Sequence, residues 1–309
     1  MAMTKKYFSF TALSVLALLM VFAVFACEKA IIPDDEDNGV GDVDGNLRVT
    51  VYRIGKTPFE TLTRGAADGM TRGAVSAPAS GLLRLNFAIY DMQGTRVKQV
   101  NQTSDNSSFG TASFQLEPGT YQLVVVGHSS SGNPTMTDLG KIQFKNSQGF
   151  TDTFLYYSDD VVVTEESQEI PVSLERIVSM CRFVMTDDYP ADVAQMRFQY
   201  KGGSGAFNAA TGLGSVNSTQ TLYFDAAEGQ KQFDLYTFLH DEEGTIHLQV
   251  TAYDADDNIL QEREFDVPME RDHITWLTGA FFTGSGSSSS TTITVTVNTD
   301  WAGETHLTF

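Results

Sequence analysis

Alternation of apolar and polar residues from residue 47 onward is the feature that most constrains the fold of this chain. Leu47, Val49 and Val51 fall on one face of an extended segment, and the pattern returns in later segments separated by turn residues. A period of two is typical of β-strands that bury one face, and no segment carries the long 3.6-residue period of an amphipathic helix. The sequence therefore predicts an all-β protein.

Turn residues divide the alternating sequence into short strands. Glu117-Pro118-Gly119-Thr120 places Pro and Gly where a tight reversal needs them, and residues 254–258 form a second turn of this kind. Near residues 174–177 the apolar positions change parity, which indicates either a bulge or the passage from one domain to the next. We expect strands near 47–51, 83–89, 96–100, 121–126, 142–144, 161–163, 196–200, 221–224, 233–239, 246–253, 259–267 and 273–282.

The first 26 residues have the composition of a signal peptide. Lys5 and Lys6 precede a mostly apolar stretch that ends in Val24-Phe25-Ala26-Cys27. This ending resembles a bacterial lipobox, in which the cysteine thiol is acylated with chains such as palmitate and becomes the new N-terminus. Several acyl chains give stable membrane anchoring. We therefore expect Cys27 to be the lipidation site; the alternative is an ordinary secretory signal in which Cys27 is incidental.

Acidic residues dominate the segment after Cys27. Residues 34–46 are rich in Asp, Asn and Gly, a composition that cannot bury apolar area and that is typical of a tether. The whole chain has a net charge of -19 over 309 residues. Such a surface repels phosphate backbones, so we expect no nucleic-acid partner.

The length of the chain suits two medium domains. We expect these divisions: a signal peptide at 1–26, an acidic tether at 27–46, an N-terminal β-sandwich at 47–168, a C-terminal β-sandwich at 169–283, and a hinge with a last strand at 284–309. In this last segment a Gly/Ser run precedes an alternating stretch whose face carries Ile293, Val295 and Val297. That stretch can pair with its own sheet or be donated to another subunit.

The sequence offers little for catalysis. It has no phosphate-binding loop, no HExxH, no CxxC and no GxSxG motif, and its five histidines show no metal-ligand spacing. The acidic turn 254–258 lacks the Gly and Glu that an EF-hand requires, and Cys181 lies on an apolar face. We therefore expect a protein that is not an enzyme, with no catalytic residue, no metal and no cofactor.

Several motifs together resemble one bacterial family. They are the lipobox at Cys27, the early strand 47–52, the L-x-P-G-x-Y turn at 116–121, the junction Val172-x-Leu174-x-Arg176, and the late segment 267–282. This combination is similar to the fimbrillin superfamily of Bacteroidales, which includes FimA-type stalk pilins, tip adhesins and FimB-type anchors. The resemblance implies two tandem transthyretin-like β-sandwich domains. The acidic run after Cys27 is similar to surface-export signals of Bacteroidetes lipoproteins and implies the outer face of the outer membrane.

The resemblance also implies assembly by strand exchange with other fimbrial subunits. In the family, a protease cuts after an Arg that follows the first strand, that strand leaves, and a strand of another subunit fills the groove. Here the leaving strand would carry Leu47, Val49 and Val51, and Arg64 and Arg72 would be the candidate cleavage positions. Without cleavage the protein would remain a lipidated anchor or adhesin, and either form could contact a host protein or glycan receptor.

A glycan-binding surface lipoprotein is the alternative function. Trp276, Trp301 and Tyr253 are the aromatic side chains that could stack on sugar rings if they are exposed. The competing interpretation of both tryptophans is packing in the core or at its rim.

Overall fold

The computed structural model describes residues 45–54, 82–146, 151–226, 229–284 and 301–309, and the backbone of two short strands outside them. Residues Glu36–Phe309 form one compact unit. Throughout these described ranges the regular secondary structure is β-strand and no α-helix occurs, as the alternation predicts. The same residues include no helix with the length and apolarity needed to cross a bilayer.

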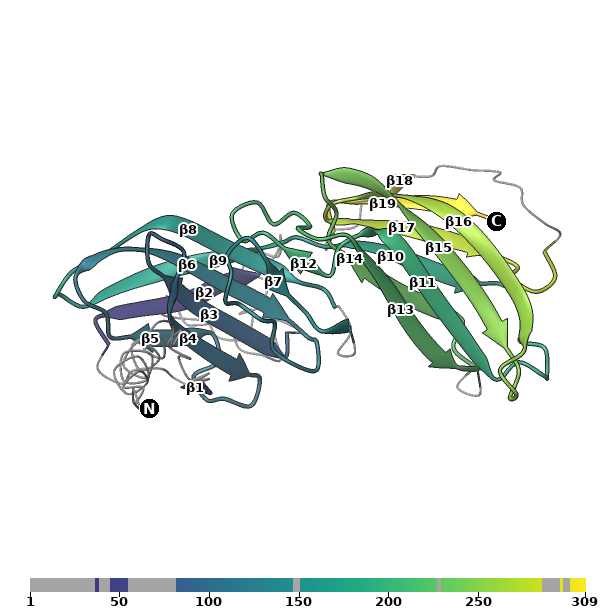
Figure 1. Cartoon of the computed structure of the whole chain (residues 1–309), viewed down its shortest axis with the longest axis horizontal. Coiled ribbons are helices and arrows are strands. Elements are labelled where there is room, and N and C mark those ends of the chain that lie inside the picture. The colour runs from purple at the N-terminus through teal and green to yellow at the C-terminus, as the bar shows by residue number, and fades with distance from the viewer. Residues whose placement is uncertain are drawn as a thin grey trace, which may run out of the picture. The chain divides into compact units, whose positions relative to one another are not determined.

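An eight-stranded sheet holds the N-terminal strands (Figure 1). Its order is β1 (Asp37–Asn38), β4 (Arg96–Thr103), β3 (Arg84–Tyr90), β6 (Gly119–His128), β8 (Phe154–Val163), β9 (Gln168–Arg176), β2 (Leu47–Ile54) and β5 (Thr111–Phe114). Strands β8 and β9 share only the pairs Phe154↔Arg176 and Leu155↔Glu175. The sheet folds over at this short junction, so that β4, β3, β6 and β8 form one layer and β9, β2 and β5 form the other.

The later strands form a second pair of layers (Figure 1). One sheet has the order β14 (Gln232–Thr237), β10 (Ser179–Met185), β17 (His273–Gly279), β19 (Gly303–Thr308) and β18 (Val295–Thr296). The other has the order β13 (Ser218–Asp225), β11 (Gln195–Gly203), β15 (Glu243–Tyr253) and β16 (Ile259–Glu270). The short strands β7 (Ile142–Gln143) and β12 (Ala206–Phe207) pair with each other.

Each pair of layers encloses its own hydrophobic core, so the structure contains two β-sandwiches. In the first core, Val49 of β2 lies with Phe87 of β3 and Leu123 of β6. In the second, Phe183 of β10 lies with Phe198 of β11 and Leu248 of β15. Successive side chains of a strand alternate between the sandwich core and the opposite face of the sheet, because successive Cβ atoms point to opposite faces.

A third cluster of buried residues combines side chains from both sandwiches. Tyr90 and Val126 of the first contribute to it, together with Met180, Phe238 and Ile274 of the second. These residues lie on the sides of their strands opposite to the two sandwich cores. Both faces of β3, β6 and β10 are therefore buried over part of their length.

The change from first to second sandwich comes later than the expected boundary between 168 and 169. Strand β9 pairs with β2, and its Val172 and Leu174 lie in the first core. The change of apolar parity marks the passage from β9 to β10, where Ile177 and Val178 both enter the third cluster. Strand β9 belongs to the first sandwich because it pairs with β2, which lies more than a hundred residues earlier in the chain. Local alternation carries no information about such a distant partner.

The chain ends in a strand that the alternation does not predict. Strand β19 pairs in parallel with β17 and antiparallel with β18, so it lies inside the five-stranded sheet. Its sequence, Gly-Glu-Thr-His-Leu-Thr, has one apolar residue in six. Backbone pairing with β17 and β18 therefore stabilises β19, whose own composition does not favour a strand.

Candidate functional site

Strand β2 is the candidate for exchange, and it occupies an interior position in its sheet. It runs parallel to β9 along almost its whole length and antiparallel to β5 through residues Leu47 to Thr50. Leu47, Val49 and Val51 are fully buried, and Ile54 is 7% exposed. The three residues expected to line the exchanged strand therefore do share one buried face, and the chain's own β2 fills the groove.

A side-chain clamp fixes the start of β2. The Asn46 amide donates from Nδ2 to the carbonyl oxygens of Leu116 (2.9 Å) and Thr164 (2.8 Å). The Leu116 amide donates back to Asn46 Oδ1 at 3.0 Å. Next to it the backbone runs so close to Phe114 that a Cβ at Gly45 would lie 2.6 Å from the Phe114 carbonyl oxygen. The clamp joins β2 to the β5–β6 and β8–β9 turns.

Polar side chains of β2 contact Glu169 of the neighbouring strand β9. Thr50 donates to Glu169 Oε1 at 2.7 Å, and the Tyr52 hydroxyl reaches the same oxygen at 3.1 Å. Removing β2 would expose the apolar partners of its four buried side chains, at roughly 1.5–3 kcal/mol for each side chain. It would also leave unpaired backbone groups along β9 and β5. An emptied groove would thus favour a replacement strand of matching alternation.

The other exchange candidates and the processing candidates are less fully described. Cys27, Arg64, Arg72, Ile293 and Val297 lie outside the described residues. Only the backbone of Val295 is described, and it pairs with Thr305 of β19. In this structure the segment around Val295 therefore pairs with the chain's own sheet.

Residues 301–309 pack firmly against the second sandwich. Trp301 and Leu307 are 7% and 8% exposed. The Phe309 ring stacks 5.1 Å from Phe183, and its backbone nitrogen donates to the Thr278 carbonyl at 3.0 Å. Leu307 thus belongs to the second core and Phe309 packs against it, whereas Trp301 belongs to the third cluster.

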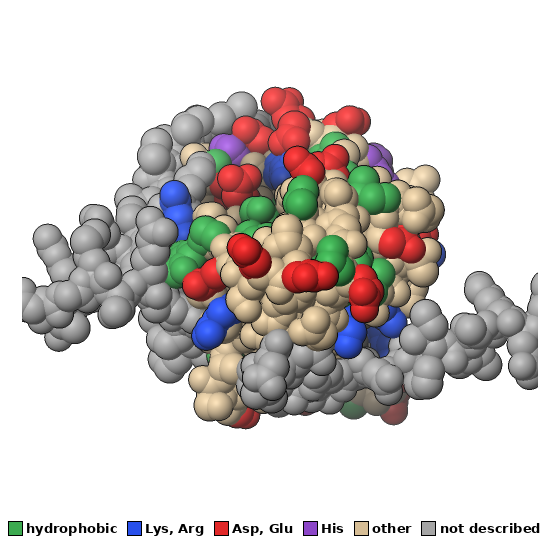
Figure 2. Space-filling view, turned by 90° about the vertical axis from the view of Figure 1, so that its left-hand side faces the viewer, with side chains coloured by type: hydrophobic (Ala, Val, Ile, Leu, Met, Phe, Trp, Pro, Cys, Tyr) green, Lys and Arg blue, Asp and Glu red, His purple; other side chains and the backbone are tan. Residues whose placement is uncertain are grey.

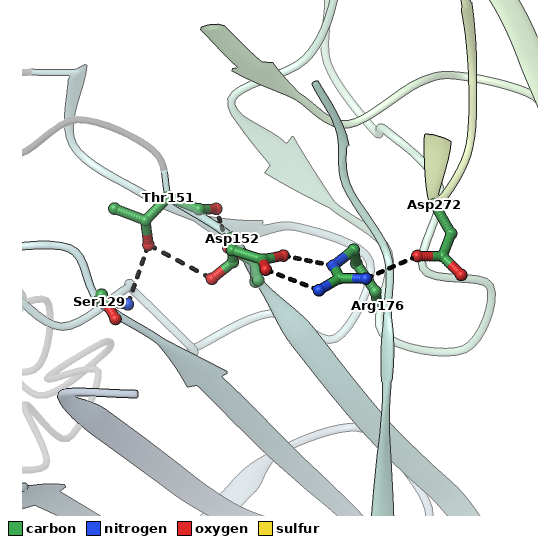
Figure 3. Close-up of polar contacts among 6 residues, drawn as sticks. Ser129, Thr151, Asp152, Arg176 and Asp272 are labelled. Carbon is green, nitrogen blue, oxygen red and sulfur yellow. Dashed lines mark hydrogen bonds and ion pairs between the residues drawn. The ribbon is translucent and has the colours of Figure 1, made fainter. Parts of the chain in front are cut away.

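A charged network lies at the end of β9 (Figure 3). Arg176 donates two hydrogen bonds to Asp152, from Nε at 2.6 Å and from Nη2 at 2.9 Å, and one from Nη1 to Asp272 at 3.0 Å. Its guanidinium lies 4.0 Å from the centre of the Trp301 ring and 4.8 Å from that of Phe154. One cation thus links residues of β8, of the β16–β17 turn and of the chain's end.

Burial and ion pairing act against each other at this network. Burial raises the pKa of the Asp152 carboxyl, and its bidentate contact with Arg176 opposes that shift. Asp272 has a left-handed backbone (φ 57°), and its amide donates to the Val178 carbonyl at 3.0 Å. A paired and hydrogen-bonded cation between two carboxylates serves structure, since each of the three charged groups already has its partner.

Groups that could do chemistry are engaged in structural roles. Cys181 is fully buried, and burial raises the pKa of its thiol to about 12, so no thiolate forms near neutral pH. Asp254 accepts hydrogen bonds from the Asp256 and Asn258 amides and so closes the hairpin turn at 254–258. Among the described residues, no group of three His, Cys, Asp or Glu side chains is arranged to hold a metal ion.

The aromatic residues named for glycan stacking are mostly occupied. Trp301 is buried under Arg176. Trp276 stacks on His306 at 5.3 Å and lies under Arg182 at 4.8 Å. Neither indole offers a free face, which supports packing as the role of both tryptophans. Tyr253 is only half-buried, with Arg197 5.4 Å from its ring centre.

The surface seen from the side of the first sandwich carries more acidic than basic side chains (Figure 2). Red carboxylate side chains are spread over this face with hydrophobic side chains between them, and blue cationic side chains are sparse. This distribution agrees with the overall charge of -19 and repels polyanions.

Comparison with known proteins gives a family match and several structural likenesses. A family model described as a family of unknown function (DUF6562) matches residues 41–308. No curated protein matches the chain. The solved structures similar to it include a Bacteroides ovatus protein described provisionally as an adhesin, with TM-score 0.45, 16% identity, and coverage of 71% of this chain and 81% of that one.

Two further similar structures have fimbrial names. One is a fimbrial assembly protein from Parabacteroides distasonis, with TM-score 0.39, 12% identity, and coverage of 76% of this chain and 90% of that one. The other is the fimbrial anchor protein Mfa2 from Porphyromonas gingivalis, with TM-score 0.38, 12% identity, and coverage of 70% and 80%. At these TM-scores and identities, the likeness to solved structures assigns no role to this chain.

Proposed function

The chain belongs to the DUF6562 family, whose function is unknown. We propose that it is a surface lipoprotein that acts as a fimbrial subunit, anchor or tip adhesin. In this proposal Cys27 carries the lipid at the outer membrane, and other fimbrial subunits are the partners. The observation that carries the proposal is the position of β2: an interior strand with a fully buried face, near the N-terminal end of the folded unit.

Strand exchange is the proposed mode of assembly. A strand that leaves an interior position creates a groove with apolar pockets and two free backbone edges, which favours a strand of matching pattern from another subunit. Arg64 and Arg72 are the proposed cleavage positions, because cleavage there would separate β2 from β3 in the chain. The proposed donor face carries Ile293, Val295 and Val297.

Mass spectrometry of the native surface protein tests the anchoring and the processing. An intact, acylated Cys27 terminus would identify the permanently anchored form and exclude polymerisation by loss of β2. A terminus at Gly65 or Gly73 would identify the polymerising form. A mature protein with neither terminus, recovered away from the cell surface, would contradict the proposal.

A matched pair of substitutions in β2 tests the groove itself. Val49→Asp places a carboxylate in the first core, whereas Arg48→Asp changes only the exposed neighbour on the opposite face. We expect the first variant to be lost from high-molecular-weight surface assemblies and the second to be retained, as measured by gel filtration of detergent extracts. Equal recovery of both variants in the assemblies would contradict a role for β2 and its groove.

A further inference from the structure

The strands β13, β11, β15 and β16 form a four-stranded sheet of the second sandwich (Figure 1), and its outward face carries aligned polar residues. Inward side chains of these strands fill the second core, so the alternate positions point outward. The strand register aligns them in three rows across the sheet. The rows are Tyr223–Arg197–Thr251–Glu262, Thr221–Gln199–Gln249–Glu264, and Lys201–His247–Asp266.

A hollow of about 410 Å³ lies over the second and third rows. Its polar lining includes Gln199, Lys201, His247, Glu264 and Asp266. This size suits a ligand of one or two sugar units. A register shift in β11 between Tyr200 and Gly203 lies beside the hollow, and a bulge of this kind bends its strand.

The bulge depends on glycine. Gly202 has a positive φ of 99°, and a Cβ there would lie 2.4 Å from the Thr245 carbonyl oxygen of the neighbouring strand. No other residue fits this conformation and this close approach. The backbone conformation at Gly202 therefore determines the course of β11 beside the hollow.

Hydrogen bonds within the rows hold the lining side chains in fixed positions. Gln249 accepts from Arg197 at 2.8 Å and donates to Glu264 at 3.1 Å. Gln199 donates to Thr221 at 3.3 Å, and His247 hydrogen-bonds Asp266 through Nδ1. These contacts use one oxygen each of Glu264 and Asp266, and Lys201 and His247 belong to the residues that line the hollow.

We propose that this hollow binds a neutral oligosaccharide. Its lining alternates donors with acceptors, and sugar hydroxyls both donate and accept hydrogen bonds. Glu264 and Asp266 disfavour a phosphate or an acidic sugar. Leu248 and Phe265 also line the hollow and offer apolar contact to the C–H groups of a sugar ring. Tyr223 is 58% exposed at the end of the first row and offers an aromatic ring to a ligand that extends beyond the hollow. The site is independent of strand exchange, because it lies on the second sandwich and involves neither β2 nor β18.

Chemical-shift mapping of the full chain tests the site. Maltohexaose, cellohexaose and a β-1,4-linked mannohexaose serve as neutral probes, and an oligogalacturonate serves as the acidic comparison. We expect at least one neutral probe to shift resonances confined to the three rows. Absence of shifts with all neutral probes, shifts elsewhere on the molecule, or preference for the acidic probe would overturn the proposal.

Substitutions then locate the binding. Gln199→Ala, Lys201→Ala and Tyr223→Ala each alter an outward side chain, so thermal unfolding should remain that of the parent protein. We expect each to weaken binding of the active probe by about tenfold. Lys98→Ala, which removes an equally exposed lysine on β4, should leave affinity unchanged. Unchanged affinity in all three hollow variants would overturn the assignment.

Discussion

At the scale of single residues, His128 shows how burial fixes a protonation state. Its ring is fully buried and lies edge-on to Phe144, 4.9 Å away. The Ser130 amide donates to Nδ1 at 3.1 Å, so Nδ1 carries no proton, and Nε2 donates to Asn86 Oδ1 at 2.8 Å. Burial, followed by the nearby Arg84, lowers the pKa of His128 from 6.5 to about 3.

This depressed pKa predicts a loss of stability in weak acid. The unfolded chain takes up a proton at His128 below pH 6.5, whereas the folded protein does not until about pH 3. The neutral His128 therefore contributes its full share to the free energy of unfolding above pH 6.5, and this contribution declines as the pH falls. We expect the free energy of unfolding in urea to drop by up to about 2 kcal/mol between about pH 7.5 and about pH 5. His128→Gln should remove this dependence and His247→Gln, at an exposed position, should keep it; the reverse result would contradict it.

Arg176 is the second residue whose removal should have a large effect. Arg176→Met leaves Asp152 and Asp272 without their shared cation, and its side chain is only 8% exposed. We expect a loss of about 3–5 kcal/mol in urea unfolding. Arg182→Met breaks a similar bidentate pair with Asp234, but a more exposed one, and should cost about 1 kcal/mol or less. Equal losses in the two variants would show that burial of the Arg176 pair has no energetic consequence.

At the scale of elements, β2 and β19 differ in how far their sequences reveal them. The alternation of Leu47, Val49 and Val51 predicts a strand with one buried face, and the structure confirms that face. Strand β19 has no such pattern and exists because β17 and β18 flank it. A strand with weak intrinsic preference depends on its neighbours, so its loss should affect the sheet that holds it.

Substitutions in β19 test this dependence. Leu307→Asp places a carboxylate in the second core, whereas Thr308→Asp alters an exposed neighbour. We expect the first to lower the free energy of unfolding by about 3 kcal/mol or more and the second by less than about 0.5 kcal/mol. Chemical denaturation measures both.

Deletion of residues 284–309 would be a poor test of strand donation, because it removes β19 together with the proposed donor strand.

At the scale of the whole molecule, the third buried cluster couples the packing of the two sandwiches. Phe144 stacks on Phe238 at 6.1 Å, and its amide donates to the Gly205 carbonyl at 3.2 Å. Both rings are fully buried. Side chains in direct contact are expected to show non-additive effects on stability, whereas distant ones add.

A double-mutant cycle measures this coupling. We expect Phe144→Ala and Phe238→Ala together to depart from the sum of the single effects by at least about 0.5 kcal/mol. Phe144→Ala combined with Phe198→Ala, which lies in the second core, should be additive within that range. Additive losses for Phe144→Ala and Phe238→Ala in urea unfolding would contradict an energetic coupling of the two sandwiches through the third cluster.

The β class, the buried face of several strands and the main turns follow from the sequence alone. Period-two alternation and turn residues are local properties, and they directly predicted the buried face of β2 and the hairpin at 254–258. The family resemblance added the expectation of two sandwiches.

The pairing of strands and the contacts of the polar side chains follow from the three-dimensional arrangement and not from the sequence pattern. The assignment of β9 to the first sandwich, the order of β19, the Arg176 network and the aligned rows on β13, β11, β15 and β16 all join residues far apart in the chain. Trp301 and Trp276 were ambiguous for the same reason, because their exposure depends on Arg176 and Arg182 from other strands. Alternation predicts which side of a strand is buried, but the pairing of strands in three dimensions decides which residues that side packs against.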